Sequence, residues 1–322
     1  MNSKTLSRRQ AITLTGLGVG AALTAKPRIT AADASGPDLV KTFTFCLNTA
    51  TIRGQKLGFV KEVEIAAKAG YQGIEPWIGT IQEYVDGGGS LKEMRTRLSD
   101  LGLTVESAIG FPAWVVDDDT QRAKGLEQAK REMDIVAQLG GKRLAAPPSG
   151  ATNVAGLDLF KAADRYRALL EAGDGIGVVP QLELWGFSKN LSRLGECAFV
   201  AIEAAHPKAC VLADVYHIYK GGSGFQGLSL LGRDAVQVIH MNDYPAEPTR
   251  EKINDSQRVF PGDGVGNVPR VLQALLTNGG PKVLSLEIFK KEYWEQDALW
   301  VARTGLEKMK TVARQTLELP AA

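Results

Sequence analysis

The sequence predicts a single α/β domain, a (β/α)8 TIM barrel at residues 41–318, preceded by an N-terminal export signal. Three observations support this. From about Lys41, apolar runs that suit buried strands alternate with helical patterns over short connections, which is typical of a parallel sheet. Four of these runs end in a possible metal ligand and lie about 25 to 50 residues apart, the length of a strand, a helix and two loops. The chain of 322 residues is long enough for one such domain.

Residues 1–34 have the features of a twin-arginine signal peptide. The paired arginines of SRRQ precede an apolar run, 11–25, that is too short to span a bilayer comfortably, and an A-x-A cleavage site follows at 32–34. Ala11 stands where the motif usually has Phe. We therefore expect a periplasmic or exported protein with no membrane association in its mature form. An uncleaved tail or membrane anchor is the alternative.

Eight strands are predicted from apolar runs bounded by glycine, proline or polar residues, at 42–47, 71–76, 103–109, 142–148, 178–186, 210–217, 236–243 and 282–289. Seven amphipathic segments predict the intervening helices, at 59–69, 90–101, 120–139, 157–171, 191–205, 268–277 and 296–316. Glycine ends the first three helices, Pro207 limits the fifth, and Pro269 lies in the first turn of the sixth. The sixth and seventh strands are joined only by a short apolar segment near Leu228.

Two connections are candidates to cover a site at the barrel rim. Residues 242–264 follow the seventh strand and are polar and proline-containing, and they exceed the usual length of a connection. Residues 77–89 end in three consecutive glycines, which predicts either a second lid or a plain surface turn.

Four strand ends present side chains that can bind a divalent cation: Glu183, Asp214, His240 and Glu287. Any one of them could simply cap the next helix. Because all strands of a barrel end at one rim, the four should meet there, and the carboxylates would repel one another unless a cation neutralised them. Carboxylates with one imidazole suit Mn, Co or Mg better than structural zinc. We therefore expect one divalent metal ion.

Composition and motifs argue against several other functions. The net charge is +2 and the basic residues are scattered, so no surface for nucleic acid or anionic membrane is indicated. Cys46, Cys197 and Cys210 lack CxxC spacing and are expected to be buried, unpaired side chains. His206 precedes a proline and is expected to be structural. GDGVGN at Gly262 does not directly follow a strand, which favours a turn over a phosphate cradle.

The Glu, Asp-x-x-His, His, Glu series resembles the xylose isomerase-like TIM barrels, the superfamily of sugar phosphate isomerases and epimerases that includes ketose 3-epimerases, inosose dehydratase and endonuclease IV. The resemblance covers essentially the whole chain after the signal. It implies that the four strand-end residues hold one metal ion, and that His217 of DVYH and Arg258 of RVFPGDG contact substrate oxygens, with Arg250 as the alternative arginine. It also implies a small carbohydrate substrate and a homodimer. Endonuclease IV is disfavoured because its three-metal site needs several histidines and this chain has three.

Such a site would transfer protons beside a carbonyl group. A divalent ion can hold the carbonyl and neighbouring hydroxyl of a keto sugar and stabilise the enediolate, with Glu183 and Glu287 as the acid/base pair. Return of the proton gives an epimer or an isomer. Loss of a β leaving group from a 3-keto-glycoside or inosose would instead make the protein a lyase or dehydratase, and a non-catalytic sugar-binding barrel is a third hypothesis. Export favours a free or glycosidic sugar over a phosphorylated one.

Aromatic residues near the predicted rim could stack on a sugar or pack beneath the loops: Trp77, Trp114, Trp185, Tyr216 and Tyr293. Trp185, which lies two residues beyond Glu183, is assigned to substrate binding. Glu75, at the end of the second strand, is a candidate hydrogen-bonding group behind the metal ligands.

Overall fold

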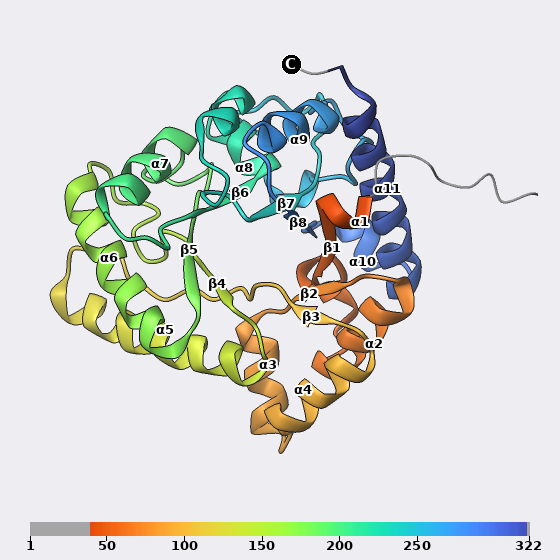
Figure 1. Ribbon diagram of the computed structural model, residues 1–322, viewed down its shortest axis with the longest axis horizontal. Coiled ribbons are helices and arrows are strands. Elements are labelled where there is room, and N and C mark those ends of the chain that lie inside the picture. The colour runs from red at the N-terminus through yellow and green to blue at the C-terminus, as the bar shows by residue number, and fades with distance from the viewer. Residues whose placement is uncertain (1–38, 321–322) are drawn as a thin grey trace, which may run out of the picture. The chain divides into compact units, whose positions relative to one another are not determined.

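The computed structural model describes residues 39–320, so the predicted signal peptide lies outside the described residues. Within them, eight strands form one sheet in the order β3-β2-β1-β8-β7-β6-β5-β4, and helices lie outside it (Figure 1). Every pair of neighbouring strands in that order is parallel, as predicted. The strands are β1 (Phe43–Asn48), β2 (Gly73–Glu75), β3 (Thr104–Val105), β4 (Arg143–Ala146), β5 (Val179–Glu183), β6 (Val211–Asp214), β7 (Val238–Met241) and β8 (Lys282–Leu286).

The seam between β3 and β4 is bridged by single backbone hydrogen bonds rather than by a strand ladder. Ala108 N donates to Arg143 O at 3.2 Å, and Ala145 N donates to Ala108 O at 2.9 Å. The next residue, Ile109, bonds instead to the chain after β2, through Pro76 O at 2.9 Å. The predicted third strand, 103–109, is therefore reduced to two residues, because the backbone beyond Val105 divides its hydrogen bonds between two neighbours.

Most predicted helices are present with small shifts at their ends. The helices are α1 (Leu39–Thr42), α2 (Phe59–Ala69), α3 (Ile78–Asp86), α4 (Leu91–Asp100), α5 (Asp119–Gln138), α6 (Leu159–Ile176), α7 (Leu194–Glu203), α8 (Val215–Lys220), α9 (Val268–Leu276), α10 (Lys291–Trp294) and α11 (Ala298–Glu318), with 3-10 turns η1 (Thr49–Gln55), η2 (Phe225–Leu230) and η3 (Asp255–Gln257). Gly70 ends α2 in the left-handed region, at φ 99°, as its position predicts. Among residues 39–320, no helix combines the length and apolar character needed to cross a membrane.

Two local predictions need correction. Residues 78–86 form the helix α3 rather than a plain surface turn, because Ile78 and Ile81 place two apolar side chains on one buried face and the glycines begin only after Asp86. The sixth strand ends at Asp214 and does not extend to His217. The Asp214 carboxylate accepts the backbone N–H of His217 at 2.8 Å, so it caps α8, which begins at once.

An apolar layer of side chains fills the barrel interior below the candidate site. The main core fills the space between the sheet and the helices. A separate small cluster of buried apolar side chains comprises Cys46, Ile109, Ala145, Leu212, Val238 and Val283. Side chains two residues apart on a strand share a face, so Leu212 is followed on the same face by Asp214, and Val238 by His240. The apolar layer thus lies directly below the polar one. The three cysteines are free and buried, as predicted.

Candidate metal centre

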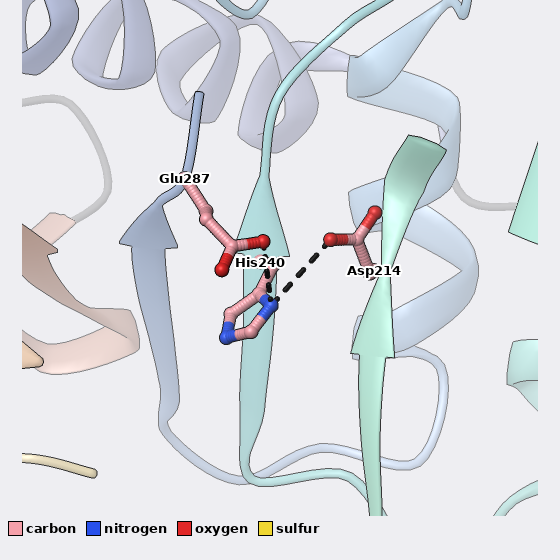
Figure 2. Close-up of side chains that lie close together, drawn as sticks. All are labelled: Asp214, His240 and Glu287. Atoms are coloured by element: carbon pink, nitrogen blue, oxygen red, sulfur yellow. Dashed lines mark ion pairs between the residues drawn. The ribbon is translucent and has the colours of Figure 1, made fainter. Parts of the chain in front are cut away.

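Asp214, His240 and Glu287 project toward one another from the ends of the adjacent strands β6, β7 and β8 (Figure 2). One possible ligand atom of each lies within 4.8 Å of those of the other two. His240 Nδ1 is 3.4 Å from Asp214 Oδ2 and 3.2 Å from Glu287 Oε2. Glu183, at the end of β5, places Oε1 3.6 Å from the same nitrogen. The structure therefore brings together all four residues that the sequence assigns to a metal.

The cluster fits one divalent cation. Both ring nitrogens of His240 are buried without a hydrogen-bond partner among the described residues: Nδ1 faces three carboxylates, and Nε2 faces the carboxylate of Glu75. Burial lowers the pKa of His240, but the carboxylates of Glu287 and Glu75 outweigh it and hold that pKa well above its usual value. Surroundings that stabilise a positive charge on His240 this strongly can instead stabilise a cation bound between His240 and the carboxylates. Asp214, His240 and Glu287 are the residues whose ligand atoms lie close enough together to hold it, and Glu183 lies beside them.

Glu183 has a raised pKa, and burial is the main cause. Burial raises the pKa of Glu183 to about 8, with the carboxylates of Glu287 and Asp214 adding to the rise and His240 opposing it. A raised pKa favours the protonated form of this carboxyl in the metal-free protein. Its position in the cluster therefore combines possible metal ligation with possible proton transfer.

Glu75 lies behind His240, in the position expected of a hydrogen-bonding group. Its Oε2 is 3.2 Å from His240 Nε2, and it accepts hydrogen bonds from Asn48 Nδ2 at 3.0 Å and from Ser285 Oγ at 2.5 Å. Burial raises the pKa of Glu75, but His240 and the hydrogen-bond donors outweigh it and lower that pKa below its usual value. An ionised Glu75 thus orients the imidazole and leaves Nδ1 facing the other carboxylates.

Asn48 is a site residue that sequence reasoning missed. Its amide Nδ2 donates to Glu287 Oε1 at 3.2 Å as well as to Glu75, while its Oδ1 accepts from Ala50 N at 2.9 Å and from Trp77 Nε1 at 3.2 Å. The only sequence signal was its place at the end of β1, two residues after Cys46 on the inward face. Asn48 therefore ties a possible metal ligand to the wall of the cavity.

Asn242 is a second missed residue, on the other side of the cluster. Its Nδ2 lies 3.3 Å from Asp214 Oδ1 and 3.4 Å from the backbone oxygen of Glu287, and its Oδ1 accepts from Tyr216 N at 2.8 Å. It follows β7 directly after Met241. The two asparagines thus contact Glu287 from β1 and β7, the strands on either side of β8, and Asn242 also contacts Asp214.

Arg258 is buried against the carboxylates, although it belongs to a long connection. Its Nη1 donates to Asp214 Oδ2 at 2.9 Å and to Glu287 Oε2 at 2.8 Å, and its Nη2 lies 3.1 Å from His217 Nε2. Burial raises the pKa of Asp214, but Arg258 outweighs it and holds that pKa well below the usual value. The alternative arginine, Arg250, lies elsewhere and pairs with Glu251 at the surface. The structure thus places Arg258 and His217 together beside the cluster.

The long connection after β7 is anchored by Asp243. Its carboxylate accepts four backbone N–H groups, from Tyr244, Gly262, Gly264 and Gly266, at 2.8 to 3.2 Å. The amides of GDGVGN therefore bind the protein's own carboxylate, which agrees with the predicted turn. The same connection places Asp255 and Arg258 in the lining of a cavity beside the cluster, so the prediction that it covers or lines a site is confirmed.

A cavity of about 310 Å³ opens beside the cluster. Its lining comprises Trp77, Ile109, Phe111, Glu183, Trp185, Phe187, His217, Asp255, Arg258, Glu287 and Phe289. Two of the five candidate aromatic residues, Trp77 and Trp185, are therefore in the cavity wall. The other three pack elsewhere: Trp114 donates to Pro147 O at 2.7 Å, Tyr216 lies under the Arg258 guanidinium at 4.5 Å, and Tyr293 stacks on Phe260 at 4.2 Å.

Residues 63–309 match the family described as xylose isomerase-like TIM barrel. The chain belongs to this family. Members of the family with related sequences carry different activities in their names. A 3-dehydroshikimate dehydratase of Pseudomonas putida is 23% identical over 258 residues, which cover 80% of this chain and 40% of that protein. An inosose isomerase of Halalkalibacterium halodurans is 25% identical over 138 residues, which cover 42% of this chain and 49% of that protein. The chain thus spans less than half the length of these two relatives.

Solved structures share the fold over nearly the whole barrel. The crystal structure of the IOLI protein with a bound zinc atom has a TM-score of 0.79 at 20% identity and covers 86% of this chain and 100% of its own. An L-ribulose 3-epimerase has a TM-score of 0.70 at 19% identity and covers 86% of this chain and 98% of its own. At these identities the likeness establishes the architecture of the barrel.

Proposed function

We propose that the protein is a divalent-metal-dependent isomerase or epimerase of a keto sugar, with Glu183 and Glu287 as its acid/base pair. One observation supports this most directly: both carboxylates line the same cavity and both face His240 Nδ1, at 3.6 and 3.2 Å. Carboxylate-rich ligation favours Mn, Co or Mg. The names of family members, among them an inosose isomerase and an L-ribulose 3-epimerase, support the same class of chemistry.

The chain supplies the groups that this reaction needs. A bound divalent ion would act as a Lewis acid for substrate oxygens. Glu183 removes the proton from the carbon beside the carbonyl, and Glu287 returns a proton to the enediolate. Arg258 lines the cavity as a fixed positive charge, and His217 lines it with Nδ1 lacking a hydrogen-bond partner among the described residues. These two residues hold substrate oxygens, and Trp185 packs against the apolar face of the sugar.

The second candidate is a lyase or dehydratase that uses the same residues. The 3-dehydroshikimate dehydratase of Pseudomonas putida, which is related over 80% of this chain, favours it. Deprotonation beside the carbonyl of a 3-keto-glycoside or inosose would then be followed by loss of the β substituent, with Glu287 protonating the leaving group. The two reactions share their first step and differ in whether a group leaves.

We also propose that the protein is exported through its twin-arginine motif and acts as a homodimer on a free or glycosidic sugar. The motif SRRQ and the apolar run after it support export. Cell fractionation of the full chain and of a variant with both arginines replaced by lysine tests this. Accumulation of both proteins in the cytoplasm would contradict export. Light scattering of the purified protein tests the dimer.

Proton NMR in deuterium oxide tests the proposed reaction. The Mn-loaded protein is incubated with a panel of keto sugars and 3-keto-glycosides, beside a sample treated with a chelator. Metal-dependent deuterium incorporation next to the carbonyl, with no group lost, supports the isomerase or epimerase. An unsaturated product or a free aglycone moves the protein to the lyase. Binding without exchange or elimination would leave only the sugar-binding hypothesis.

A further inference from the structure

The cavity has an aromatic belt, which we define as Phe289, Trp77, Phe111, Trp185 and Phe187. Successive ring centroids in this order are 6.1, 5.2, 5.9 and 5.3 Å apart. All five residues line the cavity. They follow β8, β2, β3 and β5, so they come from the same end of the barrel as the carboxylates. The belt is therefore one continuous apolar wall built from four separate strand ends.

The belt meets the polar part of the cavity at both of its ends. The ring of Phe187 is 5.6 Å from that of His217, and the Arg258 guanidinium is 5.1 Å from the ring of Phe289. The charged lining residues, Glu183, Glu287, Asp255 and Arg258, come from β5, β8 and the connection after β7, whereas β2 and β3 contribute only apolar side chains to the lining. The cavity thus has a polar side and an apolar side.

Two belt residues are exposed although they are large and apolar. Phe111 is 39% exposed and Phe187 is 47% exposed. By contrast, Trp77 is held in place, with Nε1 bonded to Asn48 and the Arg53 guanidinium 4.2 Å from its ring. Clustered apolar surface at the mouth of a cavity is typical of a binding site. A ligand that covers these two rings would remove that surface from water.

A free sugar can place one apolar face on Trp185, but it fits the rest of this wall poorly, because the hydroxyl groups on its edges need partners. Phe111, Phe187 and Phe289 have no polar side-chain atom, so hydroxyls buried against them would lose water without replacement. A planar apolar group would stack on the same rings with favourable geometry. We propose that the aromatic belt is a subsite for a planar aromatic aglycone, and that the substrate is a glycoside rather than a free sugar. This rests on the proposed function only in placing the sugar on the polar side.

Calorimetric titration of the Mn-loaded protein tests the subsite without turnover. The ligands are phenyl and methyl glucosides and galactosides, which have no keto group. The phenyl glycosides should bind about tenfold more tightly than the methyl ones. Phe111→Ala and Phe187→Ala should each weaken phenyl glycoside binding several-fold while leaving methyl glycoside binding unchanged.

Phe160→Ala is the matched control, since Phe160 is 62% exposed on α6 and does not line the cavity. It should leave both affinities as they are. Equal affinities for phenyl and methyl glycosides, or no measurable binding of any phenyl glycoside, would overturn the subsite. Deuterium exchange into keto sugars without any phenyl preference would leave the proposed function intact. A phenyl preference with neither exchange nor elimination would support the subsite and contradict the proposed function.

Discussion

Nε2 of His240 lies 3.2 Å from Oε2 of Glu75, on the opposite side of the imidazole from the three carboxylates that face Nδ1. An acceptor on one ring nitrogen determines which tautomer is present, and so which nitrogen can bind a cation. Asn48 and Ser285 hold the Glu75 carboxylate in turn. The environment of His240 therefore depends on residues outside the group of Asp214, His240 and Glu287.

Glu75→Gln should weaken metal binding about 10- to 100-fold, because the amide no longer fixes the His240 tautomer or supports its charge. Titration of Mn²⁺ into the metal-free protein, or competition with a fluorescent chelator, measures this directly. Ser285→Ala removes one donor to Glu75 without touching His240, and it should have a smaller effect. Unchanged affinity in Glu75→Gln would show that Glu75 does not position the imidazole.

Glu183→Gln should reduce turnover by at least about 10²-fold while the protein stays folded, because the amide cannot accept the substrate proton. The deuterium-exchange assay measures the loss, and thermal unfolding checks the fold. Since Glu183 is also a predicted ligand, metal affinity is measured on the same sample. Full activity in a metal-loaded variant would exclude Glu183 as the base.

The sequence predicted the site residues whose positions follow from the order and direction of the strands. Residues at the ends of parallel barrel strands share one rim, so the approach of Glu183, Asp214, His240 and Glu287 was predictable without any contact being known. A single asparagine after a strand carries no such constraint. Asn48 does accept a local backbone N–H from Ala50, as a turn residue would, and only the fold shows that its amide also reaches Glu287.

The same limit explains the errors in local structure. The three glycines at 87–89 suggested a lid or a surface turn, whereas the burial of Ile78 and Ile81 favours a helix before them. Apolar spacing of three residues over so short a segment is weak in the sequence and strong once a neighbouring surface is present. Arg258 was expected from a family resemblance, since nothing in its own segment indicates that its side chain is buried among carboxylates.

Arg258→Ala should destabilise the metal-free protein by about 3 to 5 kcal/mol, because it leaves Asp214 and Glu287 buried without their counter-charge. Saturating Mn²⁺ should recover part of this loss, since a cation in the cluster neutralises the same carboxylates. Denaturant unfolding with Mn²⁺ and with EDTA gives both values. Arg250→Ala, in the same connection but exposed, should cost less than about 1 kcal/mol. Equal losses for Arg258→Ala with and without metal would argue against a cation at these carboxylates.

Glu62, which lies outside the candidate metal centre, should make the free energy of unfolding depend on pH. It is 3% exposed on α2, and burial raises its pKa from the usual 4.5 to about 7, against the opposing effects of Thr49 and Arg53. The folded state therefore binds this proton more tightly than the unfolded chain does. Stability from this group is fully present below about pH 4.5 and is lost as pH rises through 7.

Glu62→Gln should consequently stabilise the protein at pH 8 by an amount on the order of 1 to 3 kcal/mol and have little effect at pH 5, because the neutral amide avoids burying a charge. Urea unfolding of both proteins at the two pH values measures the difference. Glu171→Gln, which removes one exposed carboxylate from α6, controls for the change in net charge. A Glu62→Gln variant that gained no stability between pH 5 and pH 8 relative to the unsubstituted protein would mean that Glu62 is ionised and solvated in the fold, in which case the first turn of α2 must open to admit water.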